Sequence, residues 1–161
     1  MYDDLPYPYW SCSAKLVILT ETISDDEMVS AIGLEPDDRW TKGVTRKGLR
    51  RPAATSGIEY HSGEPTHVPA YNHVEAVLTK VRPVADRIAE LARTARRPAG
   101  LDDNPDPWIY LILFMFAGPY DENIRVRSHQ IEELARMGAA FELAISFDTG
   151  DHEFSAYELG T

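Results

Sequence analysis

Two kinds of apolar pattern run along the chain, and together they predict its strands. Residues 13–20 and 108–116 are rich in β-branched and aromatic side chains, whereas residues 56–62 and 141–147 alternate between apolar and small or polar side chains. The stretch 108–116 is apolar at every position, which predicts a central strand covered on both of its faces. Residues 123–127 also alternate, so we expect them to pair with that strand as a hairpin.

Two short helices are predicted by matching start and stop signals. Ser24 and Glu27 have the spacing of a capping box, and Gly33 can take the left-handed conformation that ends a helix. Ser128 can cap a later helix that Gly138 ends. On this later helix, the residues assigned to the buried side are Ile131, Leu134 and Ala135.

A longer helical region is predicted between these two helices. Asn72 is placed as its cap, and apolar residues then recur at intervals of three and four: Val74, Val77, Leu78 and Val81. Pro83 either kinks this helix or begins a second one, because proline lacks the amide hydrogen that a helix interior needs. Residues 35–52 and 98–107 are rich in charges, glycine or proline, which predicts loops.

The order of these elements predicts an α+β fold. The cap serine and the stop glycine are nine residues apart in the first half and ten in the second, so the two halves resemble each other. We expect a ferredoxin-like, split β-α-β arrangement with an antiparallel or mixed sheet of about five strands and helices mainly on one face. One domain is expected over residues 1–161, with its core in 13–147. Residues 1–12 and 148–161 are expected to be peripheral, either frayed or, in the second segment, a short extra strand.

Composition excludes several classes of protein. Hydrophobic residues make up 43% and charged residues 26% of the 161 residues, as in an ordinary globular domain. The one cysteine, Cys12, excludes a disulfide framework and a multi-thiolate metal site. The acidic, proline-interrupted start is unlike a signal peptide, and the longest apolar run has ten residues, about half a membrane span. We therefore expect a cytoplasmic protein with no membrane partner.

Charge is distributed unevenly around a formal net charge of −10. Residues 1–38 hold nine acids and one base, residues 39–97 hold five acids and twelve bases, and residues 98–161 hold twelve acids and three bases. A basic middle between acidic flanks can mark a surface for a charged partner. The alternative interpretation is that the folded chain brings these thirds together and that they neutralise one another.

The most unusual segment is 39–51, which holds six bases, no acid and Trp40. An aromatic ring within a basic loop can stack on a nucleic-acid base while the cations meet phosphates. Against this hypothesis, the acidic remainder would repel a polyanion, and the sequence has no ribonucleoprotein signature. The competing interpretation has Trp40 folding back over one end of the sheet, with the basic side chains in solvent.

Motifs for catalysis, metals or cofactors are not found in the sequence. His61, His67 and His73 are six residues apart, a spacing that does not suit a zinc site. The sequence contains neither a Gly-x-Ser-x-Gly element nor a phosphate-binding glycine loop. We therefore assign no catalytic residue, no metal ligand and no cofactor.

Several short motifs, in their order, resemble a known family. They are Ser13-Ala14-Lys15-Leu16, Ile23-Ser24-x-x-Glu27, Gly33-Leu34-x-Pro36, Trp40-x-Lys42-Gly43, Tyr60-x-Ser62, His73 and the segment Leu78 to Pro83, and Ile131-x-x-Leu134-Ala135 before Gly138. Over most of residues 13–147 the chain is similar to the bacterial family called domain of unknown function 4279. The resemblance implies a fold and a bacterial source, but no reaction. It also implies that Trp40, Lys42, Gly43 and Ser62 share a structural feature.

Three functional hypotheses follow. The leading one is a non-enzymatic interaction module, of the kind formed by immunity proteins that mask a basic protein partner; a homo-oligomer is compatible with it. The first alternative is a small-ligand binder or hydrolase with a cleft near Trp40, Lys42, Tyr60 and Ser62. The second is nucleic-acid binding through residues 39–51. The candidate binding residues across these hypotheses are Arg39, Trp40, Lys42, Arg46, Tyr60, Ser62 and His73.

Overall fold

A computed structural model of the chain describes residues 11–94, 106–117 and 124–147. Their strands form one five-stranded sheet with the order β2-β3-β1-β4-β5. The strands are β1 Ser11–Thr20, β2 Asp38–Trp40, β3 Ser56–His61, β4 Trp108–Ala117 and β5 Ala140–Phe147. Neighbouring strands are antiparallel except β4 and β5, which are parallel, so the sheet is mixed.

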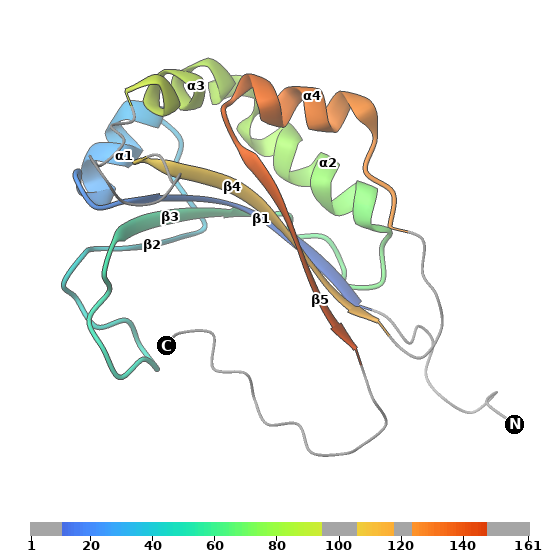
Figure 1. Cartoon of the computed structure of the whole chain (residues 1–161), viewed down its shortest axis with the longest axis horizontal. Coiled ribbons are helices and arrows are strands. Elements are labelled where there is room, and N and C mark those ends of the chain that lie inside the picture. The colour runs from blue at the N-terminus through green and yellow to red at the C-terminus, as the bar shows by residue number, and fades with distance from the viewer. Residues whose placement is uncertain (1–10, 95–105, 118–123, 148–161) are drawn as a thin grey trace, which may run out of the picture.

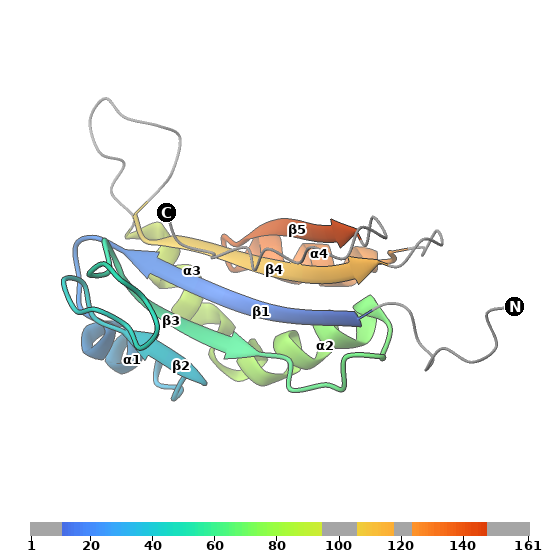
Figure 2. The same ribbon diagram turned by 90° about the horizontal axis from the view of Figure 1, so that it is seen from below.

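The helices all lie on one face of this sheet (Figure 1). They are α1 Asp25–Ile32, α2 Ala70–Val81, α3 Ala85–Arg93 and α4 Ser128–Arg136, with a 3₁₀ turn, Arg82–Val84, between α2 and α3. Seen from the opposite side, the strands lie in front of the helices and no described helix covers them (Figure 2). The molecule thus has two layers, with its apolar core between the helices and the sheet.

The core consists of alternate side chains of the strands and of the inner stripes of the helices. Its largest fully buried members are Leu16, Ile18, Met28, Ile32, Ile58, Tyr60, Leu78, Ile88, Leu111, Leu113, Leu134 and Met137. Alternate positions in β1, β3 and β4 supply the strand residues, because successive side chains of a strand point to opposite faces. The remaining positions of those strands point to the other side of the sheet.

The first helix has the predicted boundaries. The Ser24 hydroxyl accepts a hydrogen bond from the Glu27 amide at 3.2 Å, and the Glu27 carboxylate accepts one from the Ser24 amide at 2.7 Å. Gly33 ends the helix with a left-handed φ of 73°. The Arg87 guanidinium of α3 donates to the Ile32 carbonyl at 3.2 Å, which ties α3 to this helix end.

The α+β class and the five-stranded mixed sheet are confirmed, but the ferredoxin-like topology is not. The first unit is split as expected, because β3 lies between β1 and β2. In the second unit β4 and β5 are direct neighbours, joined through α4. A parallel pair needs such a crossover helix, so this half forms an ordinary β-α-β unit.

Two strand predictions were wrong. The hairpin predicted between the strand at 108–116 and residues 123–127 is not formed. Residues 124–127 form no strand, and β4 pairs with β1 and β5. The interior strand β4 is covered by described helices on one face only (Figure 2), and its side chains on the other face are half-buried. In addition, the predicted loop 35–52 contains the short strand β2.

Three helix assignments were also wrong. Ser128 is the first residue of α4 and does not cap it, because Arg127 is the N-cap. Helix α2 begins at Ala70 after Pro69, so Asn72 lies inside the helix and does not cap it. On α4 the buried residues are Gln130 and Leu134, whereas Ile131 is 43% exposed and Ala135 is also exposed. The reason is that Gln130 turns toward α2, where its amide donates to the Tyr71 carbonyl at 2.9 Å.

Pro83 lies in the 3₁₀ turn and separates α2 from α3, one of the two outcomes expected for it. The extra strand considered within 148–161 and the loop 98–105 lie outside the described residues.

Candidate functional site

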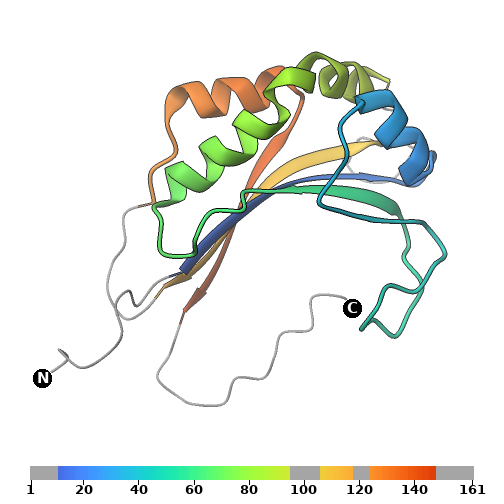
Figure 3. The same ribbon diagram turned by 180° about the vertical axis from the view of Figure 1, so that it is seen from behind.

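The candidate site is the face of the sheet that no described helix covers, which we call the open face. The sheet arches over it, and the loop between β2 and β3 descends on this side at one end (Figure 3). The strand register places five cross-strand rows on the open face. The three nearest Trp40 are Trp40, Gly57, Leu19 and Trp108; then Asp38, Glu59, Val17, Tyr110 and Ala140; and then His61, Lys15, Ile112 and Glu142. The other two are Ser13, Phe114 and Ala144, and Ser11, Phe116 and Ser146.

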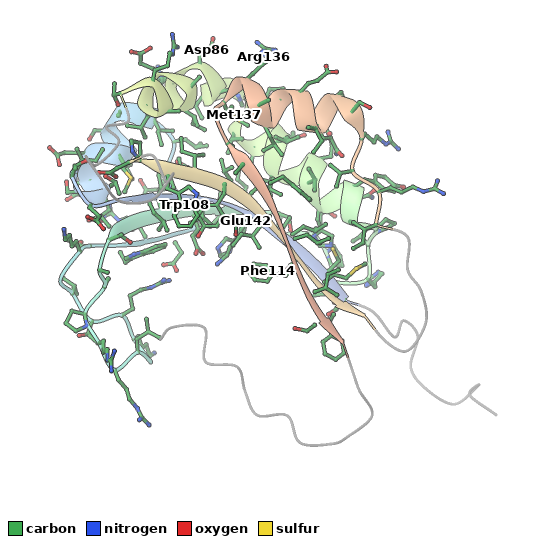
Figure 4. All side chains as sticks on the ribbon, viewed as in Figure 1. Asp86, Trp108, Phe114, Arg136, Met137 and Glu142 are labelled. Carbon is green, nitrogen blue, oxygen red and sulfur yellow. The ribbon has the colours of Figure 1, made fainter. Side chains whose placement is uncertain are left out.

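Aromatic rings of β4, the strand between β1 and the edge strand β5, run along the open face. Trp108, Tyr110, Phe114 and Phe116 occupy alternate positions of the strand and are all half-buried. The ring centroids of Trp108 and Tyr110 are 4.9 Å apart, with planes tilted by 41°. Figure 4 shows Trp108 and Phe114 below the sheet, opposite the helices that carry Asp86 and Arg136. We call these four residues the aromatic column.

A charged cluster lies beside the aromatic column. The Glu59 carboxylate is 2.7 Å from the Lys15 ammonium and 2.8 Å from the His61 ring nitrogen Nε2. Burial of Glu59 opposes its ionisation, but the hydrogen bonds from Lys15 and His61 together hold the pKa of this carboxyl below its ordinary value. The Lys15 ammonium also lies 5.5 Å from the centre of the Phe114 ring. Charges and aromatic rings are therefore in direct contact on this face.

Trp40 closes the end of the open face nearest α1. Its indole lies against Gly57, where an added Cβ would be 2.1 Å from the ring. On its other side the Arg46 guanidinium lies 4.1 Å from the ring centre and forms a 2.6 Å ion pair with Asp38. Both sides of the indole are occupied in this way, which leaves Trp40 no room to stack on a nucleic-acid base.

The other predicted basic residues near Trp40 are engaged with nearby oxygens. The Arg39 guanidinium forms a 2.8 Å ion pair with Asp26 of α1. The Lys42 ammonium donates to the Glu21 carbonyl at 3.3 Å, and its backbone amide donates to the Ser56 hydroxyl at 3.0 Å. Arg39, Lys42 and Arg46 thus fasten the β2–β3 region to the sheet and to α1.

The remaining predicted site residues lie elsewhere. Tyr60 points into the helix-covered core, where its hydroxyl donates to the Leu34 carbonyl at 2.9 Å and burial raises its pKa. Ser62 lies beyond the far end of β3 from Trp40, and its hydroxyl is 2.8 Å from Nδ1 of the fully buried His73. Burial lowers the pKa of His73, and a nearby Glu64 charge partly opposes this effect. The structure therefore brings Arg39, Trp40, Lys42 and Arg46 together but separates them from Tyr60, Ser62 and His73.

An open hollow of about 770 Å³ lies beside Ser62, between α2 and α4. Two of its charged residues are paired: Glu75 accepts from Arg82 and Gln130, and Lys80 forms a 2.7 Å ion pair with Asp37. A third, Arg127, lies 4.7 Å from the centre of the Tyr71 ring. The Ser62–His73 pair at its edge fixes the chain that leads into α2.

Within residues 11–94, 106–117 and 124–147, no three histidine, cysteine, aspartate or glutamate side chains are grouped to hold a metal ion. In the same part of the chain, no helix is long and apolar enough to cross a membrane.

The aromatic column was missed by the sequence analysis, although the sequence contains a signal for it. Between residues 108 and 116 the even positions are aromatic except Ile112, while the odd positions are aliphatic or Met. A strand covered equally on both faces has no reason to sort its side chains in this way. The alternation separates an aliphatic, helix-facing side from an aromatic open side.

Comparison with known proteins gives one match. The family model described as "Domain of unknown function (DUF4279)" matches residues 10–148. No curated protein and no solved structure matches the chain. The matched residues include every described strand and helix and the whole open face. The chain therefore belongs to the DUF4279 family.

Proposed function

We propose that the protein is a non-enzymatic interaction module whose open face binds an arginine- or lysine-rich segment of a basic protein partner, as an immunity-type protein would. The observation that carries the proposal is the aromatic column next to Glu142, which lies across from Ile112 on the same face. Aromatic residues that are rigid and half-buried supply much of the binding energy in protein interfaces.

Two aromatic rings of this face already bind cations of the chain itself. Arg46 lies over Trp40 and Lys15 over Phe114. Among the described residues, no cation lies over Trp108 or Tyr110. These two rings offer faces to which a partner's guanidinium or ammonium groups can bind.

The charge around Tyr110 favours the same kind of partner. Burial raises the pKa of the Tyr110 hydroxyl, and the negative charges of Glu142 and Glu59 raise it further. A ring in such a negative field attracts cations, and the net charge of −10 would draw a basic protein toward the molecule from a distance. Nucleic acid is a poorer candidate, because the same field repels phosphate and Trp40 is enclosed.

A fluorescein-labelled hexa-arginine peptide tests this proposal by fluorescence anisotropy with the full chain at low salt. We expect saturable binding, and no binding of a hexa-glutamate peptide. Tyr110→Leu removes one cation–π contact, worth about 1 kcal/mol, and should weaken binding about fivefold. Glu142→Gln should weaken it to a similar degree.

The matched control is Glu132→Gln, which removes the same charge from an exposed position of α4. This variant should bind hexa-arginine as tightly as the unmodified protein. Equal losses for Glu142→Gln and Glu132→Gln would show attraction to net charge alone and overturn the proposed face. Absence of hexa-arginine binding would overturn the proposal as a whole.

A further inference from the structure

The two edges of the sheet differ in how they are protected. Strand β2 has three residues, carries Asp38 and Arg39, and is held by ion pairs to its surroundings. Strand β5 has eight residues, and within the described residues only one side of it is paired, with β4. Its continuous register with β4 contains no bulge. Edge strands normally carry charges, proline or bulges that prevent pairing with another chain, and β5 has only one charge, Glu142.

Apolar side chains are exposed along this same edge. Leu143 is 44% and Ile145 is 39% exposed, and both point to the helix side of the sheet, because they pair with Leu113 and Met115. Ile131 of α4, the helix that leads into β5, is 43% exposed. Among the described residues, three of the five large exposed hydrophobic side chains therefore belong to β5 or α4.

We infer that β5 is the interface of a homodimer in which β5 pairs antiparallel with β5 of a second copy, giving a continuous ten-stranded sheet. A two-fold axis at Ala144 places Leu143 beside the partner's Ile145 and Glu142 beside the partner's Ser146. The apolar residues then cover one another, and the one charge of the strand meets a neutral hydroxyl. The patch is self-complementary, as a two-fold interface requires.

The size of the surface agrees with a weak dimer. Eight strand residues extend for about 27 Å, and the sheet and helix layers together are about 20 Å deep. Each copy would therefore bury about 500 Å², or about 1,000 Å² in total, near the lower limit for a specific interface. Two copies with a charge of −10 each repel one another, and this repulsion is screened over about 8 Å at physiological salt. Dimerisation should therefore strengthen with salt and depend on concentration in the micromolar range.

Sedimentation velocity of the full chain, from about 5 to about 200 μM and at two salt concentrations, tests the inference. We expect a shift from one chain of 18.1 kDa toward twice that mass with rising concentration, and a larger shift at high salt. Ile145→Lys should weaken dimerisation at least tenfold, because it places a charge within the paired edge. The matched control Val44→Lys, at a 56% exposed position of the β2–β3 loop, should leave it unchanged.

Circular dichroism melting of each variant confirms that it is folded. A chain that stays monomeric at 200 μM in high salt would overturn the inference, as would equal effects of Ile145→Lys and Val44→Lys. Hexa-arginine binding separates this inference from the proposed function. Tyr110→Leu should leave the dimer intact, and Ile145→Lys should leave peptide binding intact.

Discussion

The indole of Trp40 occupies the space that a side chain on Gly57 would need. An ideal Cβ at Gly57 would lie 2.1 Å from Cζ2 of Trp40 and 2.4 Å from Cε2, far inside contact distance. The two residues are also register partners of β2 and β3. Glycine is required here because of this close approach, and the β2–β3 loop can fold against the sheet only if the position stays empty.

Gly57→Ala should therefore destabilise the protein by about 1–3 kcal/mol, the usual effect of overpacking a filled site. Urea denaturation at pH 7 measures the change in the free energy of unfolding. In a Trp40→Leu background the same substitution should have a much smaller effect, because the obstructing ring is gone. An equal effect in both backgrounds would contradict the contact.

The sequence predicted several features that local signals determine, although the caps assigned to Asn72 and Ser128 were wrong. The capping box at Ser24, the left-handed Gly33 and the apolar stripe of α2 are all found in the structure. Such features depend on residues three or four positions apart. Strand order does not depend on such local signals. β4 pairs with β1 and β5, and not with the nearby residues 124–127, because of contacts between residues far apart in the sequence.

The candidate site was predicted less well for a related reason. The basic residues of 39–51 were singled out for their composition, but Arg39 and Arg46 form ion pairs with Asp26 and Asp38. A charge run in sequence gives no information about the acids that tertiary structure brings to it. The aromatic column required knowing which face of β4 the helices cover, and the periodicity of a single strand cannot choose between its two faces.

Replacing Lys15 with Met should expose the dependence of buried Glu59 on its cation. Glu59 is only 6% exposed, so loss of one partner should destabilise the protein by about 1–3 kcal/mol at pH 7. The folded pKa of Glu59 is lowered, so its stabilising contribution is present above the ordinary glutamate pKa and is lost as the pH falls through the folded pKa. The difference between Lys15→Met and the unmodified protein should accordingly shrink between pH 7 and pH 4.

Urea denaturation at both pH values measures this difference, and Lys47→Met is the control. Lys47 is an exposed cation of the β2–β3 loop, so its removal should change stability by less than about 0.5 kcal/mol at either pH. A pH-independent effect of Lys15→Met would show that Lys15 acts through packing and not through the Glu59 charge.

The thiol of Cys12 should be nearly inert in the folded protein. Cys12 is buried, and burial raises its pKa to about 11 from an ordinary value of 9.0. The thiolate is the reactive form, so its fraction at pH 8 falls about a hundredfold on folding, and limited access slows the reaction further. The reaction with Ellman's reagent at pH 8, followed with and without 8 M urea, measures this difference. Cys12 is the one cysteine of the chain, so the measured rate reports on this thiol alone. Comparable reaction rates with and without urea would contradict the prediction and show that the start of β1 opens readily.

Stability should also fall in mild acid because of His73. The imidazole is fully buried, its Nδ1 is 2.8 Å from the Ser62 hydroxyl, and burial lowers its pKa. Below a pH of about 6.5 the unfolded chain therefore takes up a proton that the folded chain does not. The free energy of unfolding should then decrease by up to about 1.4 kcal/mol per pH unit until the folded pKa is reached.

Denaturation between pH 7.5 and pH 5 measures this slope. The substitution His73→Gln should reduce the slope, whereas the control His67→Gln, at an exposed loop position, should leave it unchanged. An unchanged slope in His73→Gln would assign the acid sensitivity to another group.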